Sequence, residues 1–252
     1  MSERVSGVVV PLTVLICDRC RVGRQTVLVR LDVLTAEQDA FAALAAVADL
    51  TLPVPSCAPW NIGALVRHVS AVHRWAAATA RLDPEAPLPD DEPYERRADL
   101  LDYPAAASDL RAALTDTARP CPTLLGPGTV EWWVRRQVHE VLVHRFDLAA
   151  ALGVAMTVDA AVAADCIAEV VDTLQPRQVR LGRMADPEVG GVQLRTPTRV
   201  WQLGANPEAE IAGPEIAVAL LLWRRIPLQD PRITVTGDPA AAAAFVAQPL
   251  TP

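Results

Sequence analysis

The sequence predicts a mainly α-helical protein that ends in a small α+β domain. Apolar residues recur at helical spacing over residues 35–174, whereas after Pro187 they alternate as they do in strands. The composition agrees, because 51% of the 252 residues are hydrophobic, alanine is abundant and only 4% are aromatic, a mixture that favours closely packed helices. A chain of this length holds one large domain or two modest ones.

The first segment is strand-like, with VVVPLTVLIC and QTVLVRLDV on either side of a turn at DRCRVGR. Its apolar run, residues 8–17, is too short to span a bilayer and makes a poor signal peptide. We therefore expect residues 1–34 to be an N-terminal extension, either a β-hairpin or a non-native start, and the protein to be cytoplasmic. Five scattered cysteines fit reduced thiols, and we interpret the C-x-x-C of Cys17 and Cys20 as coincidence rather than a redox or zinc half-site.

A helical block is expected at residues 35–180. Thr35 and Gln38 form a capping box for a first helix that fades near Leu50, and Asn61 is a good N-cap for a second helix over 62–81. The proline-rich residues 83–93 predict a surface loop, followed by a helix over 105–118. RPCPTLLGPG breaks regular structure again, and long helices are expected at 129–152 and 159–174.

The last part of the chain, residues 187–252, is expected to form the small α+β domain. GVQLRT and RVWQLGA alternate like a hairpin with its turn at TPTR. AEIAG and ITVTGD predict two more strands, with a helix at PEIAVALLLWRR between them and another at PAAAAAFVAQ.

The net charge of −7 argues against a protein that follows nucleic-acid phosphates. No phosphate-binding loop, dinucleotide fingerprint or G-x-S-x-G nucleophile motif is present. Small anionic molecules remain acceptable ligands, since one local arginine or metal outweighs the mean charge. We expect no nucleic-acid or membrane partner.

The four histidines carry the strongest sign of chemistry, because all of them lie in LVRHVSAVHR and VHEVLVHRFD. Glu140 and His144 are four residues apart and project from one helix face. His68 lies on the apolar stripe of another helix, where an unpaired imidazole is costly, and it completes a His₂Glu set of the kind that leaves one zinc position open. The plain alternative is a surface Glu–His pair.

Three neighbouring residues lie outside this donor set. Asp147 follows His144 by three residues, where it serves either as an outer hydrogen-bond acceptor or as a catalytic carboxylate. His73 and His139 face about 140° and about 100° away from His68 and Glu140. We expect structural roles for both histidines, at the flank of the pocket.

Two signatures in these segments resemble those of the mycothiol-dependent maleylpyruvate isomerase family. They are VPSCAPWNIGALVRHVSAVHRWAA, close to VPxCPGW with a following L-x-x-H-V, and RRQVHEVLVHRFDLAAALG, close to R-x-x-H-E-x-x-x-H-R-W-D. The tail LLLWRRIPLQDPRITVTGDPAAAAAF is similar to the small C-terminal domain of that family. The resemblance covers residues 35–248.

The resemblance implies a DinB-like four-helix bundle that binds a divalent metal, usually zinc, through His68, Glu140 and His144. It also implies mycothiol or another low-molecular-weight thiol as cofactor, and an isomerase or S-transferase that acts on a small electrophilic, anionic substrate. From its position three residues after His144, we expect Asp147 to be the catalytic carboxylate. An actinobacterial host fits the lysine-free composition. The second interpretation is a non-catalytic metal-binding module that senses or sequesters a thiol or small ligand. Both a monomer and a homodimer fit the sequence.

Overall fold

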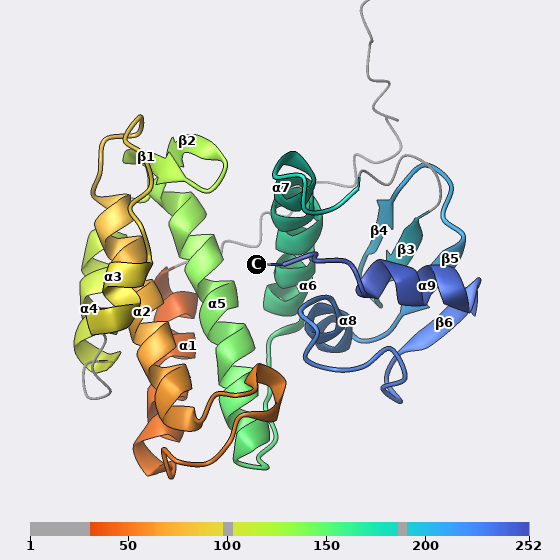
Figure 1. The fold of residues 1–252 in the computed structure, drawn as a ribbon, viewed down its shortest axis with the longest axis horizontal. Coiled ribbons are helices and arrows are strands. Elements are labelled where there is room, and N and C mark those ends of the chain that lie inside the picture. The colour runs from red at the N-terminus through yellow and green to blue at the C-terminus, as the bar shows by residue number, and fades with distance from the viewer. Residues whose placement is uncertain (1–30, 98–102, 186–190, 252) are drawn as a thin grey trace, which may run out of the picture.

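The computed structural model describes residues 31–97, 103–185 and 191–251 of the chain. Helices dominate this part, and a small sheet lies near its C-terminal end, so the predicted fold class is confirmed. Figure 1 shows the long helices on one side of the molecule and the sheet on the other, with α6 and α7 between them.

Four helices form the bundle: α1 (Leu31–Val47), α2 (Ile62–Ala80), α4 (Tyr103–Ala113) and α5 (Val130–Ala151). In the bundle, α2 packs against α4 and α5, and α1 packs against α5. Large side chains fill the space between them with no exposed surface, among them Phe41, Leu65, Leu110 and Trp133. Burial of this apolar surface is the main source of the stability of the bundle.

The two helices that carry the candidate ligands begin and end close to the predicted positions. Asn61 caps α2, and its side chain accepts a hydrogen bond from the Ala64 N–H at 2.8 Å. Thr129 is the N-cap residue of α5, and Gly153 follows that helix with a φ of +67°, where a side chain would be strained. Both predictions are confirmed.

The predicted start of the first helix is wrong. Helix α1 already includes Leu31, and the Thr35 hydroxyl donates to the Leu31 carbonyl at 2.8 Å, so Thr35 lies inside the helix instead of capping it. The reason is tertiary packing, because Leu34 is fully buried and holds this extra turn in the bundle. The predicted end of the extension, residue 34, therefore falls within α1. Residues 1–30, including Cys17 and Cys20, lie outside the described residues.

Three short elements occur where the sequence predicted no helix or strand. Strands β1 (Pro120–Thr123) and β2 (Gly126–Thr129) form an antiparallel hairpin, and α3 (Glu92–Arg97) follows the proline-rich loop. The hairpin was missed because its residues are mainly turn formers; Trp133 fixes it by donating from Nε1 to the Pro122 carbonyl at 2.8 Å. Helix α4 is shorter than predicted and ends at Ala113.

The predicted helix over 159–174 continues further than expected. Asp159 caps α6 (Ala160–Glu169), which passes through a π-helical turn (Val170–Leu174) into α7 (Gln175–Arg180). Ion pairs connect α6 to α5, and its apolar side packs against α8. This segment therefore joins the bundle to the C-terminal part of the chain.

The C-terminal α+β unit agrees with its prediction element by element. Strands β3 (Val192–Arg195), β4 (Val200–Leu203), β5 (Ala209–Ala212) and β6 (Thr234–Gly237) pair in the order β4-β3-β5-β6. The expected hairpin is the antiparallel β3–β4 pair, while β5 lies parallel to β3. Helix α8 (Glu215–Leu222) is buried on nearly all sides, and α9 (Pro239–Val246) covers the sheet.

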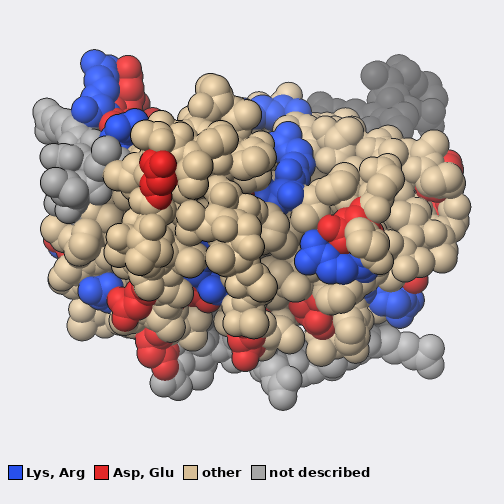
Figure 2. Space-filling view, turned by 90° about the horizontal axis from the view of Figure 1, so that it is seen from below, with Lys and Arg blue, Asp and Glu red and all other residues tan. Residues whose placement is uncertain are grey.

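The surface of the described residues gives two further facts. None of their helices combines the length and the apolar character needed to cross a membrane. On the face seen in Figure 2, basic and acidic side chains form small separate groups among uncharged residues. This face therefore offers no extended basic track of the kind that nucleic-acid binding requires.

Candidate metal centre and its pocket

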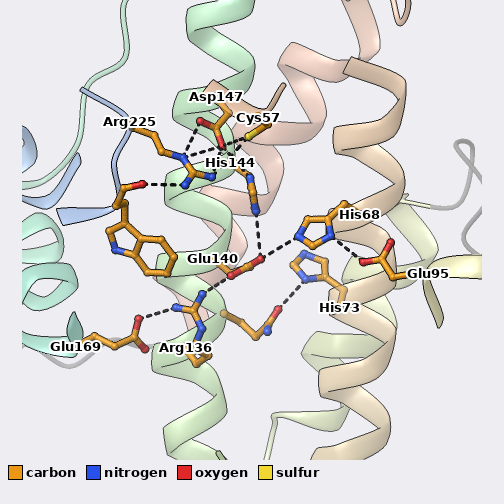
Figure 3. Close-up of polar contacts among 12 residues, drawn as sticks. Cys57, His68, His73, Glu95, Arg136, Glu140, His144, Asp147, Glu169 and Arg225 are labelled. Carbon is orange, nitrogen blue, oxygen red and sulfur yellow. Dashed lines mark hydrogen bonds and ion pairs between the residues drawn. The ribbon is translucent and has the colours of Figure 1, made fainter. Parts of the chain in front are cut away.

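Three side chains from two helices converge on one point. His68 reaches from α2 toward Glu140 and His144, which lie one turn apart on α5 (Figure 3). Glu140 Oε1 is 3.5 Å from His68 Nε2 and 3.3 Å from His144 Nε2, and one donor atom of each residue lies within 4.8 Å of the other two. The structure thus brings together the three ligands predicted from the sequence.

This donor set fits a tetrahedral divalent metal such as zinc. Zinc–nitrogen and zinc–oxygen bonds of about 2.1 Å place neighbouring ligand atoms about 3.4 Å apart, close to the two separations given above. The three residues also line one cavity, which leaves a side of the set facing open space. Two imidazoles with one carboxylate are the donors of several catalytic zinc sites.

Asp147 lies behind His144. Its Oδ2 is 2.9 Å from His144 Nδ1 and accepts a hydrogen bond from Arg225 Nη2 at 3.0 Å, while its Oδ1 accepts one from the Ser56 hydroxyl at 2.6 Å. The Asp147 side chain is fully buried and does not line the cavity. This geometry favours an outer acceptor role over the catalytic role expected for Asp147, because a carboxylate on Nδ1 fixes the ring with Nε2 toward a metal.

The other two donors are also held from behind by charged groups. Glu95 Oε1 lies 2.7 Å from His68 Nδ1, and Arg136 contacts the Glu140 oxygen that does not face the histidines. Arg136 is itself fixed by Glu169 at 2.6 Å, which extends the network from α5 to α6. In each donor residue, one atom is therefore available to a metal and a second atom contacts a neighbouring side chain.

The electrostatics favour an ionised Glu140. Burial alone raises its pKa, but the Arg136 charge and hydrogen bonds from His144 and His68 lower the pKa well below its ordinary value. For His144, burial acts to lower the pKa, and contacts with Asp147, Cys57 and Glu140 raise it well above its ordinary value. The metal-free site therefore holds a proton on His144, which a metal would displace.

His73 and His139 do not join this centre. His73 is completely buried between Gln38 and Gln137, and burial lowers its pKa to about 4. His139 is completely buried at the α5–α6 contact, with Asp165 at 3.2 Å and Glu169 at 2.9 Å. Their structural roles agree with the prediction, but neither histidine lines the pocket.

The cavity has a volume of about 790 Å³, within the range of small-molecule sites. Its walls include four tryptophans, Trp60, Trp75, Trp133 and Trp223. Arg177 also lines it, and among the described residues this half-buried guanidinium has no ion-pair partner. Partial burial, together with Arg183 and Arg180 nearby, lowers the pKa of Arg177, which still leaves a cation at neutral pH.

Two lining residues that sequence analysis missed come from distant segments. Arg225, after α8, binds Asp147, and its Nη2 lies 3.6 Å from the Cys57 sulfur. Cys57 Sγ is 3.2 Å from Asp147 Oδ2, so Cys57, His144 and Asp147 form a second group of possible metal donors. This second group is a poorer fit, since Ser56 and Arg225 already occupy the Asp147 oxygens.

The comparisons with known proteins agree with this architecture. Residues 31–149 match the family model described as mycothiol maleylpyruvate isomerase N-terminal domain. A crystal structure of a histidine-to-alanine mutant of the mycothiol-dependent maleylpyruvate isomerase is similar at 13% identity, with 82% of this chain and 92% of that chain covered and a TM-score of 0.63. A second crystal structure of the mycothiol-dependent maleylpyruvate isomerase gives 14% identity, the same coverages and a TM-score of 0.60. No curated protein matches the sequence. The structural likeness shows the fold, and the resemblance predicted from the two signatures is confirmed.

Proposed function

We propose that the protein is a metal- and thiol-dependent enzyme. Its residues 31–149 match the mycothiol maleylpyruvate isomerase N-terminal domain, and this match supports the proposal. The reaction is isomerisation of, or S-transfer to, a small electrophilic anion, with mycothiol as the thiol. Zinc is the expected metal, because two histidines and one carboxylate suit it.

The convergence of His68, Glu140 and His144 on the wall of a deep cavity carries this proposal. A structural metal site is closed on all sides by protein ligands, whereas a catalytic one keeps a position open for water or substrate. Here three donors from the protein face the cavity, and Asp147, Glu95 and Arg136 hold them from behind. This arrangement is the one expected of a catalytic site.

A divalent metal bound by these residues would supply Lewis-acid chemistry, favouring the thiolate form of a thiol and polarising a carbonyl oxygen. The residues around it bind and orient the reactants. The four tryptophans give the cavity wall large apolar surfaces, and Arg177 attracts a negatively charged substrate. The volume of about 790 Å³ allows a small anion and part of a thiol to lie side by side.

Thiol addition explains how one site serves both reactions. Sulfur forms a bond to one carbon of a conjugated double bond, and the π electrons move onto the carbonyl oxygen. Rotation about the new single bond, return of the electron pair and cleavage of the C–S bond give the other isomer and release the thiolate. Protonation of the neighbouring carbon instead keeps the C–S bond and gives a thioether, the S-transfer product.

Metal analysis of purified protein is the first test. We expect about one divalent metal per chain in the wild type and almost none in His144→Ala. His73→Gln is the matched control, because His73 is a buried histidine on the same bundle with no part in the donor set, and this variant is expected to keep its metal. Equal metal content in the wild type and His144→Ala would remove the basis of the proposal.

A thiol-dependence assay is the second test. Maleylpyruvate turnover is measured with mycothiol, with glutathione and without thiol, using wild type and His144→Ala. We expect turnover only when both thiol and an intact metal site are present. Metal and thiol binding without any turnover would support the alternative of a module that senses or sequesters a thiol.

A further inference from the structure

Gln137 presents an unused pair of hydrogen-bond donors to the cavity. It lies on α5 three residues before Glu140, so the two side chains share a helix face, and both line the pocket. Its side-chain oxygen Oε1 is 2.8 Å from His73 Nδ1. Only 1% of Gln137 is exposed, yet among the described residues its amide nitrogen Nε2 has no partner.

A hydrogen-bond relay behind Gln137 fixes the direction of this amide. Arg111 Nη1 lies 2.7 Å from Gln38 Oε1, and an arginine only donates, so this atom of Gln38 must be the oxygen. Gln38 Nε2 is then the atom 3.2 Å from His73 Nε2, to which it donates. That ring nitrogen accepts, and the single proton of a neutral His73 is on Nδ1, which donates to Gln137 Oε1.

The relay therefore fixes the Gln137 amide with its oxygen toward His73 and its nitrogen toward the cavity. A reversed amide would place its N–H groups against the N–H of His73, two donors facing each other. The Arg111 cation thus sets, through Gln38 and His73, which end of Gln137 faces the cavity. The rest of Gln137 is buried, so the small part of its surface that opens onto the cavity includes an amide nitrogen with no protein acceptor, and a ligand in the cavity can supply that acceptor.

We propose that Gln137 binds an oxygen of the substrate, a carboxylate or carbonyl oxygen of a small anion held beside His68, Glu140 and His144. This inference rests on the proposed function and adds a substrate-binding group to it. The half-buried Arg177 on the same cavity agrees with an anionic ligand. One N–H of this amide suits a single carboxylate or carbonyl oxygen, and the second N–H, which points away from the first, is left for another acceptor.

Binding of maleate, measured by calorimetry on the metal-loaded protein, tests the proposal. Gln137→Met keeps the length of the side chain and removes both donors, so maleate is expected to bind about tenfold more weakly or worse. Gln137→Glu still accepts from His73 but turns a negative charge toward the ligand, and its loss is expected to be larger. Unchanged affinity in Gln137→Met, or no binding by the wild type, would overturn the proposal.

Gln178→Met is the matched control for these variants. Gln178 is a glutamine of similar burial that donates to the Thr251 carbonyl at 2.9 Å and does not line the cavity. Its replacement is expected to leave maleate affinity unchanged. An equal loss in Gln178→Met and Gln137→Met would show a general effect of removing a buried amide and would contradict a binding role.

The direction of the relay has its own test, which needs no ligand. Nitrogen NMR of labelled protein distinguishes the two neutral tautomers of His73, and we expect the proton on Nδ1. A proton on Nε2 would mean that the relay runs the other way and that Gln137 presents its oxygen to the cavity.

Metal content distinguishes a failure of the proposed function from a failure of the role given to Gln137. Absence of metal from the wild type is a failure of the proposed function. Metal-loaded Gln137→Met that binds maleate as well as the wild type is a failure of this inference alone.

Discussion

Burial of His73 makes the stability of the protein depend on pH in a way that can be measured. The pKa of His73 is lowered from its ordinary value of 6.5 to about 4, mainly because the ring is removed from water. At pH values between these two pKa values, His73 is protonated in the unfolded chain and neutral in the folded protein. The free energy of unfolding therefore falls as the pH drops through this window, and no such loss occurs above it.

The size of the effect follows from the two pKa values. Lowering the pH from about 7.5 to about 5 is expected to cost about 2 kcal/mol of stability through this one ring, since one pKa unit corresponds to about 1.4 kcal/mol. His73→Gln removes the titrating group, and its amide still offers an acceptor toward Gln38 and a donor toward Gln137. The variant is expected to lack this part of the pH dependence.

Urea unfolding of both proteins at several pH values between about 5 and 7.5 provides the measurement. The difference between the two curves isolates His73, because every other titrating group, the donor set included, is common to both. Parallel pH profiles for the wild type and His73→Gln would refute the reasoning and mean that His73 takes up a proton in the folded protein near its ordinary pKa.

Three other substitutions test the surroundings of the site. Asp147→Asn is expected to weaken metal affinity or activity about 10- to 100-fold, because asparagine turns either a poorer acceptor toward His144 or an N–H toward Arg225. Metal-titration curves equal to those of the wild type would reduce Asp147 to a packing role. Arg225→Met removes the cation from a buried ion pair and is expected to cost about 3 kcal/mol in urea unfolding, and a cost within about 0.5 kcal/mol would contradict the importance of that contact. Trp133→Phe leaves the Pro122 carbonyl without its donor and opens a small cavity, so the free energy of unfolding should drop by about 1 to 3 kcal/mol; a variant as stable as the wild type would speak against it.

The candidate metal ligands could be selected from the sequence because their arrangement is largely local. Glu140 and His144 share a helix whose start and end are marked in the sequence by Thr129 and Gly153, and four residues along a helix give one turn. His68 could be added because it interrupts an apolar stripe. The failure at Thr35 shows the limit of such signals, since burial of Leu34 outweighs a capping motif.

The rest of the site depends on contacts between distant parts of the chain. Arg225 and Cys57 both contact Asp147 although they are far apart in the sequence, and no local pattern connects them. Glu95 comes from a short helix at the end of a proline-rich loop, and the sequence analysis predicted no element at that position. Gln137 has no sequence signal at all, because a glutamine on a helix is common and its role depends on the neighbours behind it.

The division of the pocket between two parts of the chain has an evolutionary consequence. The three candidate metal donors lie on α2 and α5, whereas Trp223 and Arg225 follow α8 and line the cavity from the C-terminal segment. Recombination or drift in the C-terminal segment can therefore alter which molecules enter the cavity while the candidate donor set stays intact. Arg225 limits this freedom, because a descendant that loses this cation leaves Asp147 buried without it. Diversification within such a lineage is expected to keep a basic residue at this position while the surrounding wall changes.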